Sequence, residues 1–316
     1  MNIKVTKKTM GIHHITAIVG NPQENVDFYA GVLGLRLVKK TVNFDDPGTY
    51  HLYFSDNGGN PGTVITFFPR SGAQPGKIGS GQVGISSFAV PRGSLVFWKE
   101  RLKEFNVTYV LKERFSEQYI AFDDPHGLQL EIVEREAGEN NQWSFGGITP
   151  NVAIKGIAGV TLFSNKPEST AILLEDIMGF ERVGEEEGLV RFKSIGDIGN
   201  IIDLKRTPMA GGTTGVGTVH HVALRAIDDE DQFAWKSHVE SYGYHVTSEQ
   251  DRNYFKAIYF KEKGGVLFEI ATDPPGFAHD ESHQTMGKNL MLPERYESQR
   301  EKLEKLLEPI EVRELK

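Results

Sequence analysis

The sequence predicts an α+β fold in which four βαβββ modules form two curved, cup-like mixed sheets, followed by a C-terminal helical tail. Three observations carry this prediction. A strand-like run occurs four times along the chain, a helix-like segment follows each run, and a glycine or asparagine at a nearly constant distance ends each helix-like segment. Repetition of one supersecondary unit at regular spacing is typical of a fold built from internal repeats.

Each module opens with a short run in which β-branched residues are frequent and the two faces alternate, as expected of a strand. These runs are GIHHITAIV, QVGISSFAV, IKGIAGVTLF and TVHHVALRA. Two of them contain the dipeptide His-His, and aligning the four runs places the two dipeptides at the same position. Equivalent positions in the four modules can therefore be compared residue by residue.

A helix follows each opening strand. In the first module, Asn21 and Pro22 resemble a capped start with proline in the first turn, and the other helices are expected at residues 94–105, 166–178 and 229–242. The helices end 19 to 22 residues after the aligned histidine position. The residues there tolerate the left-handed conformation of a helix C-terminal cap; they are Gly34, Asn106, Gly179 and Gly243.

Three further strands close each module, and the last one follows a glycine turn. These last strands are GTVITFF from Gly62, GLQLEIV from Gly127, GNIIDLK from Gly199 and GVLFEIA from Gly265. The predicted modules span residues 11–69, 81–134, 154–206 and 216–272. They form a first half (1–140) and a second half (152–275), joined by a polar, glycine-rich linker near 136–151. A tail (276–316) carries an amphipathic helix expected over 293–307.

Composition restricts the function. The chain has no cysteine and a net charge of −8 over 316 residues. The lack of cysteine excludes disulfides, thiolate metal ligands and a cysteine nucleophile, so any metal must use imidazole, carboxylate or water. Without a basic cluster or a long apolar run, we expect neither nucleic acid nor a membrane as partner. The sequence thus favours a cytoplasmic protein that acts on a small molecule.

Candidate metal ligands emerge when the modules are compared at two positions. At the aligned position of the opening strands the residues are His14, Ser87, Gly159 and His221. Four residues after the turn glycines they are Thr66, Glu131, Asp203 and Glu269. Only the first module supplies a histidine without a carboxylate, and only the fourth supplies both.

Strand alternation decides which histidine of each dipeptide faces the cup. His14 and His221 fall on the mixed face, whereas His13 and His220 fall on apolar faces expected to pack against helices. A lone strand histidine is more often a core residue, but two His-His dipeptides at equivalent positions favour ligation. Glu269 lies between apolar neighbours, so its charge needs either a cation in the cup or a basic side chain nearby.

The way the modules pair determines whether these residues meet. Pairing the first module with the second would leave one histidine in each cup. Pairing the first with the fourth brings His14, His221 and Glu269 together beside Thr66, and the second cup, without imidazole, is then structural. Two histidines and one carboxylate with open positions form the triad typical of non-haem Fe(II) and oxygen chemistry.

These segments resemble a known family. The stretches GIHHITAIVGNPQENVDFYAGVLGLRLVKKTVNFDDP, YHLYFSDNGGNPGTVITFFP, TVHHVAL, RNYFKAIYFKEKGGVLFEIATDPPGF and LPERYESQRE are similar to the vicinal oxygen chelate superfamily of glyoxalases, bleomycin-resistance proteins and extradiol dioxygenases. The resemblance covers residues 10 to about 310. It is strongest to hydroquinone-type ring-cleaving dioxygenases of Gram-positive bacteria. It implies a metal held by His14, His221 and Glu269.

The resemblance also implies catalytic residues. Extradiol enzymes place a tyrosine ten residues before the ligand glutamate, and the residue at that position here is Tyr259. The alternative role for Tyr259 is packing within the strand. Their additional histidines have no match, so His51 is the candidate proton carrier and Arg252 a candidate for positioning substrate. The aromatic residues expected to form an apolar wall for the ring are Phe67, Phe68, Tyr254 and Phe255.

We therefore expect a ring-cleaving dioxygenase that uses Fe(II), with Mn(II), Zn(II) or Ni(II) as other possible ions, and that takes a hydroquinone or catechol-like ring and O2. Two alternatives remain open: a glyoxalase-like isomerase or thiol transferase with the same three ligands, and a metal-free binding protein of this fold. Whether the tail mediates a homodimer is also open.

Overall fold

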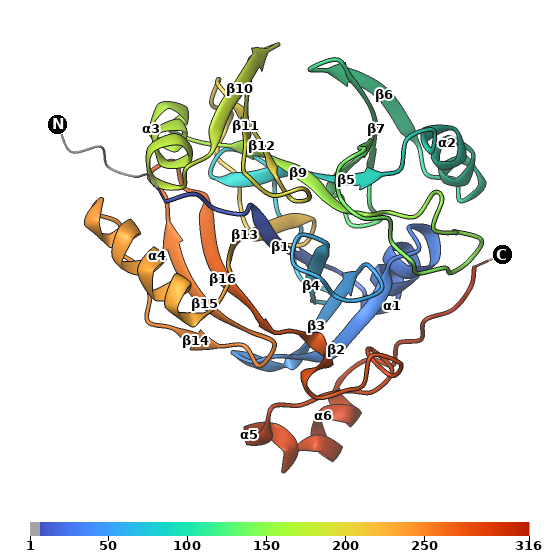
Figure 1. Ribbon diagram of the computed structural model, residues 1–316. Coiled ribbons are helices and arrows are strands. Elements are labelled where there is room, and N and C mark those ends of the chain that lie inside the picture. The colour runs from blue at the N-terminus through green and yellow to red at the C-terminus, as the bar shows by residue number, and fades with distance from the viewer. Residues whose placement is uncertain (1–6, 316) are drawn as a thin grey trace.

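The computed structural model describes residues 7–315, and its two curved sheets of eight strands each confirm the predicted fold class (Figure 1). The first and fourth modules share one sheet, and the second and third modules share the other, as the arrangement of the candidate ligands required. We call the concave faces of these sheets the first cup and the second cup.

The first sheet is built around two opening strands. Its strands are β1 (Ile12–Val19), β2 (Arg36–Asn43), β3 (Asp46–Ser55), β4 (Val64–Pro69), β13 (Thr218–Ala226), β14 (Gln250–Asp251), β15 (Phe255–Lys261) and β16 (Leu267–Pro275). Their order is β14-β15-β16-β13-β1-β4-β3-β2. Strands β1 and β13 pair antiparallel at the centre, and each runs parallel to the last strand of its own module.

The second sheet repeats this plan. Its strands are β5 (Gln82–Val90), β6 (Tyr109–Arg114), β7 (Glu117–Asp123), β8 (Gln129–Glu134), β9 (Gly156–Phe163), β10 (Glu181–Glu186), β11 (Leu189–Lys193) and β12 (Ile201–Lys205). Their order is β10-β11-β12-β9-β5-β8-β7-β6, with β5 and β9 antiparallel at the centre. The two central pairs therefore hold equivalent places in the two sheets.

The helices begin and end where the sequence predicts. They are α1 (Pro22–Val26), continued by a π-helical turn over Asp27–Val32, α2 (Leu95–Glu104), α3 (Pro167–Ile172), continued by a π-helical turn over Leu173–Ile177, and α4 (Asp229–Ser241). The side chain of Asn21 accepts hydrogen bonds from the first turn of α1. Gly34, Asn106, Gly179 and Gly243 have φ angles of 68°, 56°, 71° and 82°. These residues provide the left-handed caps that let the chain reverse into the next strand.

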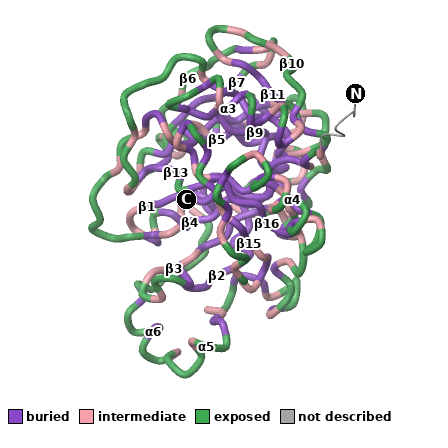
Figure 2. Tube along the Cα trace, turned by 90° about the vertical axis from the view of Figure 1, so that its left-hand side faces the viewer, coloured by how far each residue is buried: buried purple, intermediate pink, exposed green. Residues whose placement is uncertain are grey.

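The core lies between the sheets and their covering helices. Figure 2 shows buried residues concentrated along the central strands of both sheets, with exposed residues on hairpin tips and in the tail. The largest fully buried side chains include Trp98 of α2 and Trp235 of α4, which contacts β13, β15 and β16. Within residues 7–315, no helix has both the length and the apolar content needed to cross a bilayer.

The C-terminal tail differs from its predicted form. The helix expected over residues 293–307 is two short helices, α5 (Glu294–Glu297) and α6 (Arg300–Leu306). The tail packs against the β2–β3 hairpin, where Tyr296 donates a hydrogen bond to the carbonyl of Phe44 at 2.9 Å. The side chains of α5 thus contact the β2–β3 hairpin. Helical periodicity alone does not predict this long-range contact.

An ion-pair cluster lies at the base of the second cup. Arg114 donates two hydrogen bonds to Glu131, at 3.0 and 2.7 Å, and one to Asp203 at 3.1 Å. Arg191 pairs with the same Asp203 at 2.7 Å. Because both carboxylates are about 1% exposed, these guanidinium groups supply the positive charge that a buried carboxylate requires. This arrangement supports the expectation that the second cup is structural.

We expect Arg114→Met to lower the free energy of unfolding by about 3–5 kcal/mol, because the change leaves buried carboxylates without their partner. Urea unfolding at neutral pH measures this loss. The matched control is Arg182→Met, which breaks the exposed 3.3 Å pair with Glu175 and should cost less than about 1 kcal/mol. Equal losses in the two variants would contradict a structural role for the cluster.

Candidate metal centre

Strand register brings the three predicted ligands together. His14 of β1 and Glu269 of β16 both pair with Ala223 of β13, one from each side, and His221 pairs with Thr16. Residues more than 200 positions apart therefore lie on three adjacent strands at the base of the first cup. This placement depends on the antiparallel pairing of β1 with β13.

The three donor groups converge on one point. Oε2 of Glu269 lies 2.8 Å from Nε2 of His221 and 3.6 Å from Nε2 of His14, and the two Nε2 atoms are 3.3 Å apart. Neighbouring ligands on an octahedral ion with bonds of about 2.1 Å are about 3 Å apart. Among the described residues, His14, His221 and Glu269 form the group of potential metal ligands whose donor atoms lie close enough together to share one ion.

The carboxylate of Glu269 fits a cation. It is 0% exposed, and neither of its oxygens has a hydrogen-bond partner of acceptable geometry. Burial raises the pKa of Glu269, but the neighbouring imidazoles of His14 and His221 outweigh burial and hold that pKa well below its usual range. Burial lowers the pKa of His221, so its ring is neutral near pH 7. A carboxylate and a neutral imidazole are the forms that bind divalent ions.

The backbone explains why the rings take these directions. Ile12 pairs with Leu224 and His14 with Ala223, so His13 is one extra residue in β1. Thr16 pairs with His221 and Ala17 with Val219, so His220 is the extra residue in β13. Each His-His dipeptide therefore contains a β-bulge, a feature that redirects side chains and is frequent beside active sites.

The bulges correct one prediction. His13 and His220 were expected on faces turned toward helices, because side chains alternate along a regular strand. Instead, Nδ1 of His13 lies 2.9 Å from Nδ1 of His14, and Nδ1 of His220 lies 2.8 Å from Nδ1 of His221. His220 also lines the cavity above the three ligands. Alternation fails here because a bulge inserts one residue without a partner.

A cavity of about 660 Å³ opens above the three ligands. Tyr259 and Arg252 line it, and Tyr259 pairs with Glu269 across the β15–β16 hairpin. Burial and the charge of Glu269 raise the pKa of Tyr259 well above its usual value, so this side chain is a neutral phenol. Arg252 lies over the Tyr259 ring at 5.7 Å and forms an ion pair with Asp45 at 3.0 Å.

His51 also lines the cavity, but both of its ring nitrogens are engaged. Nδ1 contacts the hydroxyl of Tyr53 at 2.8 Å, and Nε2 contacts the hydroxyl of Thr66 at 2.8 Å. Thr66 in turn contacts Thr16 at 2.9 Å. Burial lowers the pKa of His51 well below its usual value. The ring is therefore neutral and linked to the cavity through hydroxyl groups.

The predicted aromatic wall is half present. Phe68 and Phe255 line the cavity, and the Phe255 ring lies 4.9 Å from the ring of His14. Phe67 is instead buried against Tyr29, and the hydroxyl of Tyr254 donates to Asp280 outside the cavity. Phe67 and Phe68 are neighbours on β4, so strand alternation allows only one of them to face the cavity.

Several lining residues escaped the sequence prediction. The end of β2 contributes Asn43, the turn that follows it contributes Phe44 and Asp45, and other segments contribute Arg70, Thr247 and Gln250. None of these positions belongs to the aligned positions of the internal repeat. They reach the cavity through the tertiary placement of these segments around the first cup.

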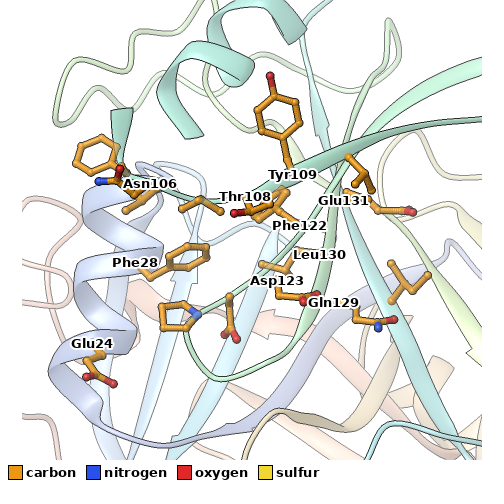
Figure 3. Close-up of a pocket in the computed structure, with 18 of the residues that line it drawn as sticks. Glu24, Phe28, Asn106, Thr108, Tyr109, Phe122, Asp123, Gln129, Leu130 and Glu131 are labelled. Carbon is orange, nitrogen blue, oxygen red and sulfur yellow. The ribbon is translucent and has the colours of Figure 1, made fainter. Parts of the chain in front are cut away.

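A second opening lies between the first and second modules. This groove has a volume of about 760 Å³. Figure 3 shows it beside α1 and strands β6–β8, with Phe28, Tyr109 and Phe122 and the carboxylates of Glu24 and Asp123 among its lining residues. Its lining contains no histidine. Although larger, the groove lacks the donor set of the first cup, so the smaller cavity is the candidate site.

The comparison with known families places the chain in one superfamily. The family model described as Glyoxalase/Bleomycin resistance protein/Dioxygenase superfamily matches residues 11–132 and 156–270, and the chain belongs to that superfamily. The resemblance predicted from the sequence is thereby confirmed.

Particular relatives match nearly the whole chain. MhqO of Bacillus subtilis, whose name assigns it provisionally to the ring-cleaving dioxygenases, is 66% identical over 98% of this chain and 100% of its own. A crystal structure titled as that of a provisional dioxygenase from the same organism superposes with a TM-score of 0.97 at 66% identity, over 98% of this chain and 100% of the other. The chlorohydroquinone/hydroquinone 1,2-dioxygenase of Sphingobium indicum is 33% identical over 95% of this chain and 97% of its own. These names agree with the reaction class expected from the sequence.

We expect the metal-free protein to take up one divalent ion and to gain stability from it, about 2.7 kcal/mol when the ion is present at 100 times its Kd. Thermal unfolding with and without added ion measures this gain. In Glu269→Gln and His14→Ala the gain should disappear, while His245→Ala, which alters an exposed histidine, should keep it. Persistence of the gain in both ligand variants would contradict this site.

Proposed function

We propose that this protein is a metal-dependent, extradiol-type ring-cleaving dioxygenase that opens a hydroquinone or catechol-like ring, with His14, His221 and Glu269 as ligands of Fe(II). The single observation that carries the proposal is the convergence of three buried donors, one of them a carboxylate without hydrogen-bond partners, at the base of a cavity large enough for one aromatic ring. The names of the full-length relatives support the same reaction class.

Fe(II) fits the donor set best. Two imidazoles and one carboxylate leave coordination positions open, and this combination is typical of iron enzymes that use dioxygen. A bound ion would supply Lewis acidity and the electronic link between the aromatic ring and O2. Mn(II), Zn(II) and Ni(II) also accept these ligands, so metal analysis is needed to choose among them.

The cavity residues orient the ring and manage its protons. Tyr259 remains a phenol, so it can donate a hydrogen bond to a substrate oxygen directed at the ligands. Arg252 places a positive charge beside that phenol and favours an ionised substrate oxygen. Phe68 and Phe255 provide apolar surface for the ring and exclude water from it.

His51 is proposed to hold protons rather than to contact the ring directly. Its nitrogens reach the cavity through the hydroxyls of Tyr53 and Thr66, and Thr66 continues to Thr16 on β1. A neutral imidazole in the middle of such a chain can accept a proton on one ring nitrogen while it releases one from the other, and so passes a proton between the hydroxyls. In this role His51 would support the deprotonation of substrate.

Oxygen uptake tests the reaction. With the iron-loaded protein, hydroquinone or catechol should consume one O2 per ring, and labelled dioxygen should deliver both of its atoms to the opened product. A thiol adduct of a 2-oxoaldehyde serves as the comparison substrate. Turnover of that adduct without oxygen uptake would favour an isomerase, and negligible metal content with no turnover would favour a binding protein.

We expect Tyr259→Phe to lower kcat/KM by about 100-fold or more, because the variant loses a hydrogen-bond donor aimed at the reacting oxygen. Metal content should be unchanged, since Tyr259 is not one of the proposed ligands. Tyr109→Phe, in the groove between the first and second modules, is the matched control and should retain full activity. A fully active Tyr259→Phe variant would leave this tyrosine with a packing role only.

A further inference from the structure

We infer that His13 and His220 are positioning residues: each accepts a hydrogen bond from the adjacent ligand histidine and so fixes which ring nitrogen of that ligand faces the metal. The inference rests on the proposed site of His14, His221 and Glu269 and concerns residues that form no part of the donor set.

The geometry is the same at both dipeptides. The Nδ1 atoms of His13 and His14 are 2.9 Å apart with the rings at 84°, and those of His220 and His221 are 2.8 Å apart with the rings at 79°. Adjacent strand residues normally point to opposite faces, so such contacts need the two bulges. The bulges thus place an imidazole directly behind each ligand ring.

Hydrogen bonding sets the roles of the four rings. Two Nδ1 atoms at this distance share one hydrogen, so one ring donates and the other accepts. A neutral ligand imidazole that presents the lone pair of Nε2 to an ion carries its hydrogen on Nδ1. His14 and His221 are therefore the donors, and His13 and His220 are the acceptors. Such partners orient the ligand ring and increase its basicity.

The second sheet shows that the bulge does not require histidine. Ser87 pairs with Gly159 and Phe88 with Ile157, so Ala158 is the extra residue of β9, at the position equivalent to His220. There the bulge remains, but neither a ligand histidine nor an acceptor histidine accompanies it. The acceptor imidazoles occur only in the cup that contains the ligand imidazoles.

The two acceptors lie in different surroundings. His13 is 3% exposed, and its ring packs 5.4 Å from the ring of Phe255. His220 is exposed at the wall of the cavity, where its ring lies 6.0 Å from that of Phe68. Substitutions at His220 therefore leave the core intact, whereas those at His13 alter it.

Cobalt binding to the metal-free protein tests the inference without substrate. We expect His13→Phe and His220→Phe each to weaken Co(II) affinity by about 10- to 100-fold, measured by competition with a chromophoric chelator. His13→Asn and His220→Asn should recover most of the affinity, because the side-chain oxygen of asparagine can accept in place of Nδ1. Ser86→Ala, at the equivalent of His13 in the second sheet, is the control and should bind as the wild type does.

Proton NMR of the Co(II) protein gives a second readout that a loss of packing alone would not move. The wild type should show two exchangeable, strongly shifted signals from the Nδ1–H groups of His14 and His221. Each Phe variant should lose one of them through faster exchange with water, and each Asn variant should keep both. If His13→Phe does not fold, the His220 pair of variants decides the question.

The outcomes separate the two proposals. Unchanged affinity and unchanged signals in the Phe variants would overturn the positioning role while leaving the metal site intact. A wild type that binds no Co(II) would overturn both. Binding with the expected variant effects but without oxygen uptake would support the positioning role and contradict only the proposed reaction.

Discussion

The antiparallel pairing of β1 with β13 is the constraint on which the rest of the structure depends. It joins the first and last modules into one sheet and sets the register that places His14 and Glu269 on either side of Ala223. A shift of that register by one residue would turn the side chains of one strand to the opposite face of the sheet. The candidate site therefore depends on a contact between segments about 200 residues apart, and neither half of the chain contains it alone.

The two cups solve one electrostatic problem in two ways. Each has carboxylates at its base that are almost completely shielded from water, and a buried charge is costly unless it is compensated. In the second cup the side chains of Arg114 and Arg191 supply the compensating positive charge. In the first cup, Glu269 faces two imidazoles and no guanidinium, so full compensation is left to an external cation. Both cups keep an opening above these groups, of about 660 Å³ in the first and about 580 Å³ in the second, so the two cups differ in the groups at their base.

The bulged His-His dipeptides connect backbone geometry to chemistry. A regular strand would have sent His13 and His220 away from the ligands, and the added residue in each strand instead brings an imidazole behind each ligand ring. Tyr259 reaches the same centre by a different route, the ordinary cross-strand pairing of a hairpin with Glu269. The site thus combines the bulged dipeptides, which are irregular, with the β15–β16 hairpin, which is regular. Only the pairing in the hairpin follows from residue spacing.

The sequence by itself determined the four-module plan, the left-handed caps at Gly34 and Asn106, and the choice of three candidate ligands, because glycine spacing and the aligned His-His dipeptides are local features that survive without tertiary contacts. Tertiary structure alone decided the bulges at His13 and His220, the division of the tail helix, and which aromatic residues face the cavity. The reason is physical: periodicity specifies which residues share a face of a regular element. Bulges and loop placement arise from pairing between distant strands, and a single sequence carries no local signal for them.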